Sequence, residues 1–443
     1  MKRIFYFLVL IATCVACQDD ESFSTNSGVR LDFSVDTLKL DTVFCRTPSS
    51  TYTFWVHNHN NEGIRLNQVR LRRGNQTGYR VNVDGIYLDN ANGSQTNDIE
   101  VRRNDSILVF VELTPLETHQ SGPVLLEDDL LFTLESGVEQ KVLLQAWIWD
   151  AMKWYNPVID KDSVIASETP IIIYGDMKVA EGVTLTLRNT TLFFHDGSGL
   201  EVYGSLQTEN CTMRGDRLDD MFTYLPYDRV SGQWKGIRLY ESSTDNILRQ
   251  TEIRNPLYGI ICDSADFDAT RYRLLMQNCI VHNCDGDGLK ETNAHIRLEN
   301  CQLTNTLGHC LHVLGGEVEV MYCTLAQFFP FSANRGKALY FTNAPTPLNG
   351  FICEGTIVTG YEDDVILGEI RNKDFPFVYY FKNCLLRTEV NTTNPDNFED
   401  IIWESPNDSI QGKDQFVKID EENLDYDFHL SEKSTAAGLG CYR

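Results

Sequence analysis

The sequence is poor in basic residues. Its 443 residues include 38 lysines and arginines against 63 aspartates and glutamates, a formal net charge of −25. A surface this negative repels phosphate backbones, so we expect no nucleic-acid partner. Long apolar runs are missing after the first seventeen residues, which excludes a protein with several membrane-spanning helices. The hydrophobic content of 42% in turn excludes a mainly disordered chain.

Cysteine pairs at zinc-ligand spacing are missing as well. The 13 cysteines form no Cys-x-x-Cys pair after residue 17, so the sequence contains no zinc ribbon or thioredoxin-like motif. His57 and His59 lie close together, but no third ligand accompanies them, and no metal site is predicted. P-loop, dinucleotide-binding and serine-nucleophile motifs are also absent. No short motif therefore indicates the function, and it must be inferred from residues that are far apart in the sequence.

The N-terminus has the pattern of an export signal. Lys2 and Arg3 precede the apolar run 4–11, which is too short to span a bilayer as a helix and is typical of a signal peptide. Val15 and Ala16 before Cys17 resemble the lipobox of bacterial lipoproteins, and the acidic stretch 18–21 resembles the export signal of Bacteroidetes surface lipoproteins. The resemblance implies a signal peptide over 1–16, lipidation of Cys17, an acidic tether over 17–28 and an outer-membrane lipid anchor at the cell surface. A simple secreted protein is the alternative.

Residues 29–150 alternate apolar and polar side chains in short runs separated by turn residues. The runs 31–35, 52–56, 79–83, 107–111 and 142–146 all show this alternation. Short strands at such spacing predict a β-sandwich of about 120 residues. The stretch 54–60, with the strand-like segments that follow it, resembles bacterial Ig-like modules, which implies an Ig-like fold for 29–150.

Residues 151–443 are dominated by a repeat. The pattern of an asparagine, a cysteine or threonine, any residue and then an aliphatic residue recurs, with relatives, along this part. Cys279, Cys301 and Cys323 follow one another at steps of 22 residues. A period near 22 with insertions confined to certain turns indicates a solenoid, and short β-forming segments between the turns favour a parallel β-helix. Stacked coils would place the cysteines in one interior column as packing thiols, rather than as disulfides or metal ligands. The asparagines before them would form an amide ladder, and a second column of small residues, such as Gly259 and Gly288, would allow bends with positive φ.

A family resemblance supports this fold. The segments 171–187, 200–206 and 425–440 resemble right-handed parallel β-helix proteins of Bacteroidetes, in the pectate lyase-like superfamily. The resemblance implies an all-β chain, an N-terminal Ig-like β-sandwich followed by a right-handed single-stranded parallel β-helix. The superfamily includes lyases, hydrolases and adhesins, so this resemblance specifies the fold and leaves the activity open.

One outward row of the predicted β-helix carries the candidate chemistry. Asp287 and His309 are 22 residues apart, so they are predicted neighbours on successive coils. With Lys290 they form a candidate catalytic group, because a carboxylate, an imidazole and an amine can move protons in glycoside hydrolysis or lyase chemistry. The candidate binding residues are Lys337 and Asp363, which belong to the same row, and Asp285, which lies close to it. The alternative is that these side chains have no catalytic or binding role and form an ordinary row of acidic and basic residues on the surface.

No cofactor is required by these motifs, although the segment 285–288 (Asp-Gly-Asp-Gly) could bind calcium through its two carboxylates. Turn formation is the other explanation of that segment. We expect a monomeric envelope protein whose β-helix binds a polysaccharide or an envelope partner. The alternative function is a polysaccharide lyase or glycoside hydrolase that uses Asp287 and His309.

Overall fold

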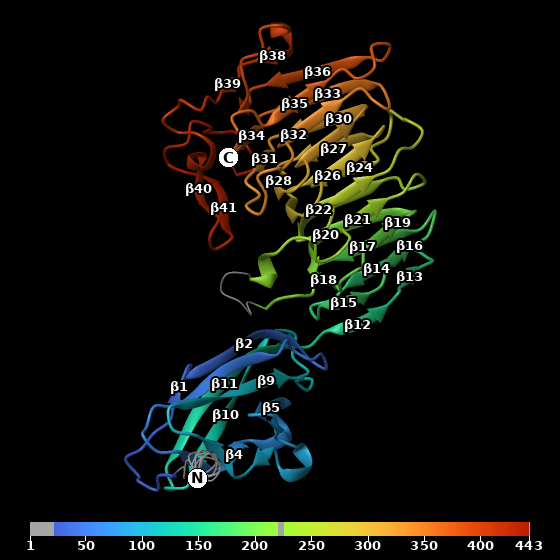
Figure 1. Cartoon of the computed structure of the whole chain (residues 1–443). Helices are drawn as coiled ribbons and strands as arrows, with labels where there is room; N and C mark the ends of the chain where they lie inside the picture. The colour runs from blue at the N-terminus through green and yellow to red at the C-terminus, as the bar shows by residue number, and fades with distance from the viewer. Residues whose placement is uncertain (1–21, 220–225, 443) are drawn as a thin grey trace, which may run out of the picture. The chain divides into compact units, whose positions relative to one another are not determined.

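A computed structural model describes residues 22–219 and 226–442. The predicted signal peptide and the lipidation site Cys17 lie outside the described residues. The described residues divide between two compact units, Met1–Asp150 and Ala151–Arg443 (Figure 1). No helix in the described part of the chain has the length and apolar character needed to cross a membrane.

Unit 1 contains two β-sheets that are mostly antiparallel. One sheet has the strand order β1 (Asp32–Phe33), β3 (Tyr52–Asn58), β9 (Asp105–Leu113), β5 (Tyr79–Val83), β6 (Ile86–Tyr87). The other has the order β2 (Thr37–Phe44), β11 (Glu139–Trp149), β10 (Val124–Leu134), β4 (Ile64–Leu71), β7 (Gln95–Thr96), and β8 (Ile99–Val101) also pairs with β4. Two short 3₁₀ turns interrupt this unit: η1 (Gly74–Gln76) and η2 (Asn90–Asn92).

The alternation in the sequence explains why these strands form two sheets. Strand β3 buries every second residue, and β9 does the same over most of its length, so each has one apolar face. The Phe33 ring of the first sheet lies 5.0 Å from the Phe132 ring of the second. The two sheets therefore face each other through their apolar sides.

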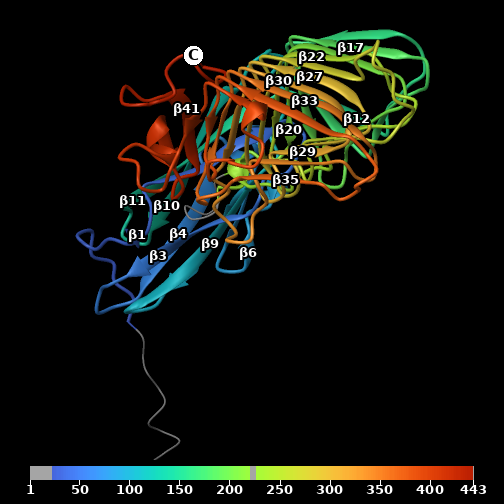
Figure 2. The ribbon, with the colours of Figure 1, turned by 90° about the horizontal axis from the view of Figure 1, so that it is seen from above.

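Unit 2 is a parallel β-helix whose strands stack in three columns (Figure 2). Column 1 comprises β12 (Met152–Tyr155), β15 (Ile171–Tyr174), β18 (Thr191–Phe194), the second halves of β20 (Ser205–Gly215) and β22 (Asn246–Arg254), β25 (Ile280–Cys284), β28 (Gln302–Thr306), β31 (Thr324–Gln327), β34 (Ile357–Gly360), β37 (Leu385–Leu386) and β39 (Ile402–Trp403). Column 2 comprises β14 (Ser163–Ala166), β17 (Thr184–Arg188), the first halves of β20 and β22, β24 (Leu274–Gln277), β27 (His295–Glu299), β30 (Gly316–Met321), β33 (Leu348–Glu354), β36 (Phe377–Lys382) and β38 (Phe398–Glu399). Column 3 comprises β13 (Val158–Ile159), β16 (Met177–Val179), β19 (Leu200–Val202), β21 (Ile237–Leu239), β23 (Ile260–Cys262), β26 (Leu289–Thr292), β29 (Leu311–Leu314), β32 (Leu339–Thr342) and β35 (Ile366–Glu369).

The length of the sequence repeat equals the length of one coil of the β-helix. Ile280 pairs with Gln302, and Gln302 with Thr324, so the preceding cysteines stack in the same register. Cys279, Cys301 and Cys323 are fully buried, and the backbone N–H of Cys301 lies 3.4 Å from the Cys323 sulfur. Every cysteine of the described residues is free. The predicted interior column of packing thiols is confirmed.

The asparagines that open the repeat motif form the corner between columns 2 and 1. Five of them adopt φ between +47° and +55°, which suits asparagine better than most residues: Asn189, Asn210, Asn278, Asn300 and Asn383. The Asn210 amide donates to the Asn189 side-chain oxygen over 2.8 Å, which is one rung of the predicted amide ladder.

The small residues before the column 3 strands are required for a different reason from the one predicted. Gly236 adopts φ +97°, but positive φ occurs at neither Gly259 nor Gly288. A Cβ atom on Gly259 would lie 2.1 Å from the Gly288 carbonyl oxygen, and one on Gly288 would lie 2.6 Å from that of Cys310. Close approach of successive backbones therefore requires these two glycines, and the prediction of a positive φ there is wrong.

The C-terminal segment leaves the coils and packs on the outside of column 1. It contains the antiparallel hairpin of β40 (Phe416–Asp420) and β41 (Asp425–Leu430), preceded by η4 (Pro395–Asn397) and η5 (Gly412–Gln415). Phe416 and Phe428 form a second buried cluster with the outward side chains Phe328, Ile357 and Leu385. The loop between β20 and β21 contains η3 (Tyr227–Arg229). This loop and the hairpin both project from the outward face of column 1 and border the surface between them.

Candidate functional site

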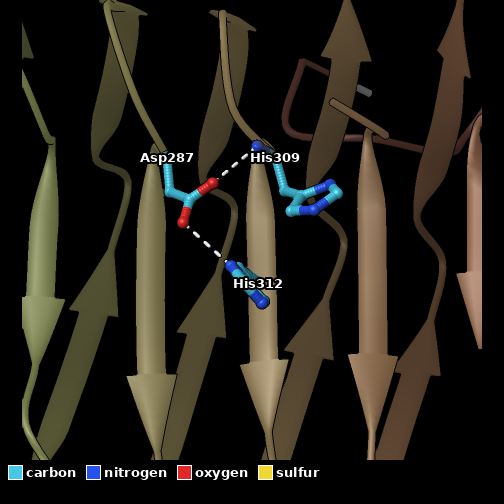
Figure 3. A group of neighbouring side chains, drawn as sticks. All are labelled: Asp287, His309 and His312. Carbon is cyan, nitrogen blue, oxygen red and sulfur yellow. Dashed lines mark hydrogen bonds and ion pairs between the residues drawn. The ribbon is translucent and has the colours of Figure 1, made fainter. Parts of the chain in front are cut away.

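Asp287 and His309 are neighbours, as their spacing predicts. Each lies in the turn two residues before a column 3 strand, β26 and β29, and Leu289 pairs with Leu311 in those strands. The contact differs from the predicted one, because the backbone N–H of His309, and not its ring, donates to the Asp287 carboxylate over 2.7 Å (Figure 3). The imidazole that contacts Asp287 belongs to His312, whose Nδ1 lies 2.8 Å from the other carboxylate oxygen.

His312 was missed by the sequence analysis. It is the second residue of β29 and points outward between two inward aliphatic residues. Its row contains Lys290 on the coil before and Tyr340 on the coil after. His312 could have been found in the sequence, because the residue directly after the first aliphatic residue of each column 3 strand points outward and these residues form a row.

The hydrogen bonds keep Asp287 ionised. Burial acts to raise the pKa of Asp287, but the hydrogen bonds from His312 and from the N–H of His309 outweigh burial, so its pKa lies below the ordinary value. A carboxylate in this state accepts hydrogen bonds and is a poor proton donor. The site therefore lacks the protonated carboxylic acid that a glycosidase needs.

His309 is held as a neutral ring. Burial, and then the proximity of His312, lower the pKa of His309 to about 4. The backbone N–H of Lys337 donates to His309 Nδ1 over 2.9 Å, and the Tyr340 ring stacks on His309 at 4.8 Å. Tyr340 in turn donates to Glu369 over 2.8 Å, which fixes the wall of the site.

The other predicted site residues lie around this group without joining it. Lys290 forms no ion pair within residues 22–219 and 226–442. Asp285 is exposed, and partial desolvation raises the pKa of its carboxyl group. Lys337 contributes its backbone N–H, while its ammonium group faces Asp364 at 3.9 Å. Because Leu339 pairs with Ile366, Asp364 occupies the row position that the sequence analysis assigned to Asp363.

The assignment of Asp363 to the outward row is therefore wrong. Its carboxylate instead pairs with Arg387 at 3.2 Å and is 72% exposed. A longer loop before β35 shifted the register by one residue, which spacing alone does not reveal.

One group of described side chains has a geometry that could hold a metal ion: Asp287, His309 and His312, whose ligand atoms lie within 4.8 Å of one another. Asp285 is not part of this group. The predicted pairing of Asp285 with Asp287 around calcium therefore gains no support from the arrangement of the carboxylates.

A second candidate site lies on the outward face of column 1, beneath the C-terminal hairpin. It is a cavity of about 370 Å³, here called the arginine cleft, and its floor contains Arg254, His282 and Gln302. Arg214, Asp228 and Arg229 close one end, and the segment 424–429 and Tyr442 form the other wall. Sequence analysis missed this cleft because its walls are more than 100 residues apart along the chain.

Some charged side chains of the arginine cleft form ion pairs, whereas Arg214 forms none among the described residues. Arg254 pairs with Glu252, and Asp427 with His429. The Arg214 guanidinium donates to backbone carbonyl oxygens, including that of Asp228 at 2.7 Å, and forms no ion pair with any described carboxylate. Burial lowers the pKa of Arg214 to about 10, so it remains a cation at neutral pH.

The polar wall and floor contain further hydrogen-bonding groups. Burial, and then the charge of Arg254, lower the pKa of His282 to about 3, so its ring is neutral. Its Nδ1 contacts the Thr304 hydroxyl at 2.8 Å. The buried Tyr426 hydroxyl has no hydrogen-bond partner among the described residues.

Comparisons with known proteins support the fold. Residues 162–325 match the family model for the right-handed β-helix region. Two solved structures are similar at low TM-score: the catalytic unit of a GH87 α-1,3-glucanase from Streptomyces thermodiastaticus (10% identity, 81% of this chain and 95% of that chain, TM-score 0.24) and a family 123 glycoside hydrolase from Clostridium perfringens (6% identity, 29% of this chain and 30% of that chain, TM-score 0.19). This chain thus spans less than a third of the Clostridium enzyme, and no curated protein matches it. Residues 162–325 are therefore similar to right-handed β-helix regions, in agreement with the parallel stacked strands of unit 2.

Proposed function

We propose that this protein is a lipid-anchored protein of the bacterial outer membrane that binds an acidic glycan in the arginine cleft. Unit 1 acts as an Ig-like spacer and the β-helix as the binding unit. The observation that carries the proposal is the Arg214 guanidinium, which lines this cavity with Arg229 and Arg254 and forms no ion pair with a described carboxylate, although Asp228, Asp425 and Asp427 also line the cavity.

Charge and shape both favour an acidic sugar chain. An acidic protein needs a local basic site to hold a polyanion, because its overall field is repulsive. The half-buried Arg214 guanidinium has no carboxylate partner in the described part of the chain, and guanidinium groups recognise carboxylates with matched hydrogen bonds. Tyr426, Phe428 and Tyr442 also line the cleft, and flat rings with polar edges suit sugar faces. The volume of about 370 Å³ is in the usual range for ligand sites.

The Arg254→Gln variant tests the cleft. Arg254 is 46% exposed, so its replacement should leave the fold intact. We expect isothermal titration of the full chain with oligogalacturonate to show a Kd raised about tenfold in the variant, because a hydrogen bond to a charged group is lost. Arg188→Gln is the matched control, since Arg188 is a 56% exposed arginine on β17 outside the cleft.

Two outcomes would contradict glycan binding in this cleft. One is equal affinity for oligogalacturonate and for a neutral β-glucan, and the other is an unchanged Kd in Arg254→Gln. Reducing ends or unsaturated sugars released during the titration would instead favour the alternative of a lyase or glycoside hydrolase.

The lipid anchor has its own test in Cys17→Ala. Without the Cys17 thiol no acyl chain can be attached, so we expect the variant to lose labelling by an alkyne fatty acid and to leave the membrane fraction on alkaline carbonate extraction. Cys14→Ala is the control and should remain labelled. Retained labelling of Cys17→Ala would contradict the assignment of this cysteine.

A further inference from the structure

Three histidines of unit 2 contact an aspartate through Nδ1, and one of them differs from the others. The distances are 2.7 Å for His195 and Asp216, 2.6 Å for His429 and Asp427, and 2.8 Å for His312 and Asp287. The side chains of His195 and His429 are 52% and 61% exposed, whereas that of His312 is 16% exposed. The pair of His312 is also the one that has a second imidazole beside it, at 4.8 Å between ring centroids.

The hydrogen bonds determine which nitrogen of His312 carries the proton. The Asp287 carboxylate accepts the His309 N–H at one oxygen and faces His312 Nδ1 at the other. An ionised carboxylate can only accept, so Nδ1 of His312 carries a hydrogen and donates it. The Nε2 atom of neutral His312 is then left with a free lone pair, as in a histidine that an aspartate orients to act as a base.

His309 has the opposite tautomer. Its Nδ1 accepts the backbone N–H of Lys337 at 2.9 Å, so the single proton of the neutral ring is on Nε2. The two rings are nearly perpendicular, at 74°, and Tyr340 packs against both. The site therefore presents a hydrogen-bond acceptor from His312 and a hydrogen-bond donor from His309.

This pattern favours proton transfer over metal binding. The same three side chains have the geometry of a metal-ligand group, but a metal at His309 Nδ1 would have to displace the Lys337 N–H. A metal at His309 Nε2 would require the proton to move to Nδ1, where it would meet that same N–H donor. Neither cost arises if the two rings act as base and donor.

We propose that His312 is the general base, and His309 the hydrogen-bond donor, of a site that hydrolyses carboxylic esters with water. His312 Nε2 takes a proton from water as the water oxygen bonds to the acyl carbon, and His309 Nε2–H stabilises the negative charge that develops on the carbonyl oxygen. The bond from the acyl carbon to the ester oxygen then breaks, and the alcohol leaves with the proton held by His312. Asp287 is a positioning residue that orients His312 through its contact with Nδ1.

Ester hydrolysis fits this group better than glycoside hydrolysis. The hydrolysis of a glycosidic bond uses two carboxyl groups, one of them as acid and the other as base or nucleophile. The group of described side chains holds one carboxylate, Asp287, and both of its oxygens are already occupied as hydrogen-bond acceptors. An ester needs one base and one donor to the oxyanion, and both are present.

Hydrolysis of p-nitrophenyl acetate by the full chain tests the proposal. We expect His312→Ala to lower kcat by about 100-fold, the usual contribution of a general base, with KM changed less than about twofold. Asp287→Asn should also lower kcat without raising KM, because it disturbs the tautomer of His312 and not the binding of the ester. His195→Gln is the matched control, as it removes an exposed histidine that also contacts an aspartate, and its kcat should equal that of the wild type.

Three results would overturn the proposal. The first is a wild-type rate no higher than that of His312→Ala, and the second is an equal loss in His195→Gln. The third is a rate abolished by EDTA and restored by zinc, which would make the group a metal centre. Thermal unfolding of each variant, followed by circular dichroism, separates loss of chemistry from loss of fold, and His312→Gln provides a second variant should His312→Ala unfold.

Discussion

Replacing Phe351 by alanine is expected to lower the free energy of unfolding of the β-helix by about 3–5 kcal/mol, the usual cost of deleting a buried phenylalanine ring. Phe351 is fully buried, and its ring stacks on Phe341 at 5.0 Å and contacts Phe381 at 5.6 Å. These rings come from columns 2 and 3, so the cavity would open where two faces of the coil meet. Urea unfolding monitored by circular dichroism measures the change.

Phe331→Ala is the matched control for this prediction. Phe331 is 48% exposed, and its removal should change the free energy of unfolding by less than about 1 kcal/mol. Coils of a solenoid contact mainly their neighbours, so Phe351→Ala could also give a second unfolding transition for the last coils. Equal midpoints for the wild type and Phe351→Ala would contradict the described interior.

Gly236→Ala is expected to lower the free energy of unfolding by about 3 kcal/mol, because the backbone must move to accept the methyl group. A Cβ atom at this position would lie 1.6 Å from the Tyr258 carbonyl oxygen, and the residue adopts φ +97°. Gly236 directly precedes β21, so the shift would disturb the pairing of β21 with β23. Urea unfolding is again the measurement.

Gly182→Ala separates the two causes of this effect. Gly182 adopts φ +72°, but nothing lies within 4 Å of the position of its Cβ atom. An alanine there carries the cost of the left-handed conformation alone, about 1 kcal/mol. Equal losses at Gly236 and Gly182 would show that close approach to Tyr258 does not matter.

The stacking of the coils could be predicted because a parallel β-helix repeats itself locally. Each coil buries the same turn in the same way, so the sequence repeats at the length of a coil, and Cys279, Cys301 and Cys323 follow one another in register. Where the loop length changed, the prediction was less accurate. The longer loop before β35 places Asp364, and not Asp363, in the outward row.

The candidate site on column 3 was predicted in part. The spacing of Asp287 and His309 placed them on adjacent coils, as the backbone contact between them confirms. The spacing could not show that the His309 ring turns away from Asp287, because the direction of a side chain depends on its packing partners, here Tyr340 and the Lys337 N–H. The contact of His312 with Asp287 was missed for the same reason, because it too depends on the direction of a side chain.

By itself the sequence determined the properties that repeat or depend on composition: the all-β class, the length of a coil, the interior cysteines and the strong negative charge. The tertiary structure decided the arginine cleft and the hydrogen-bond partners of His309 and His312. The cleft arises because the C-terminal hairpin returns to cover column 1, bringing Tyr426 to within 5.5 Å of the His282 ring. A contact between residues so far apart leaves no periodic trace in the sequence, since it is formed once and its stabilising free energy is spread over many apolar contacts.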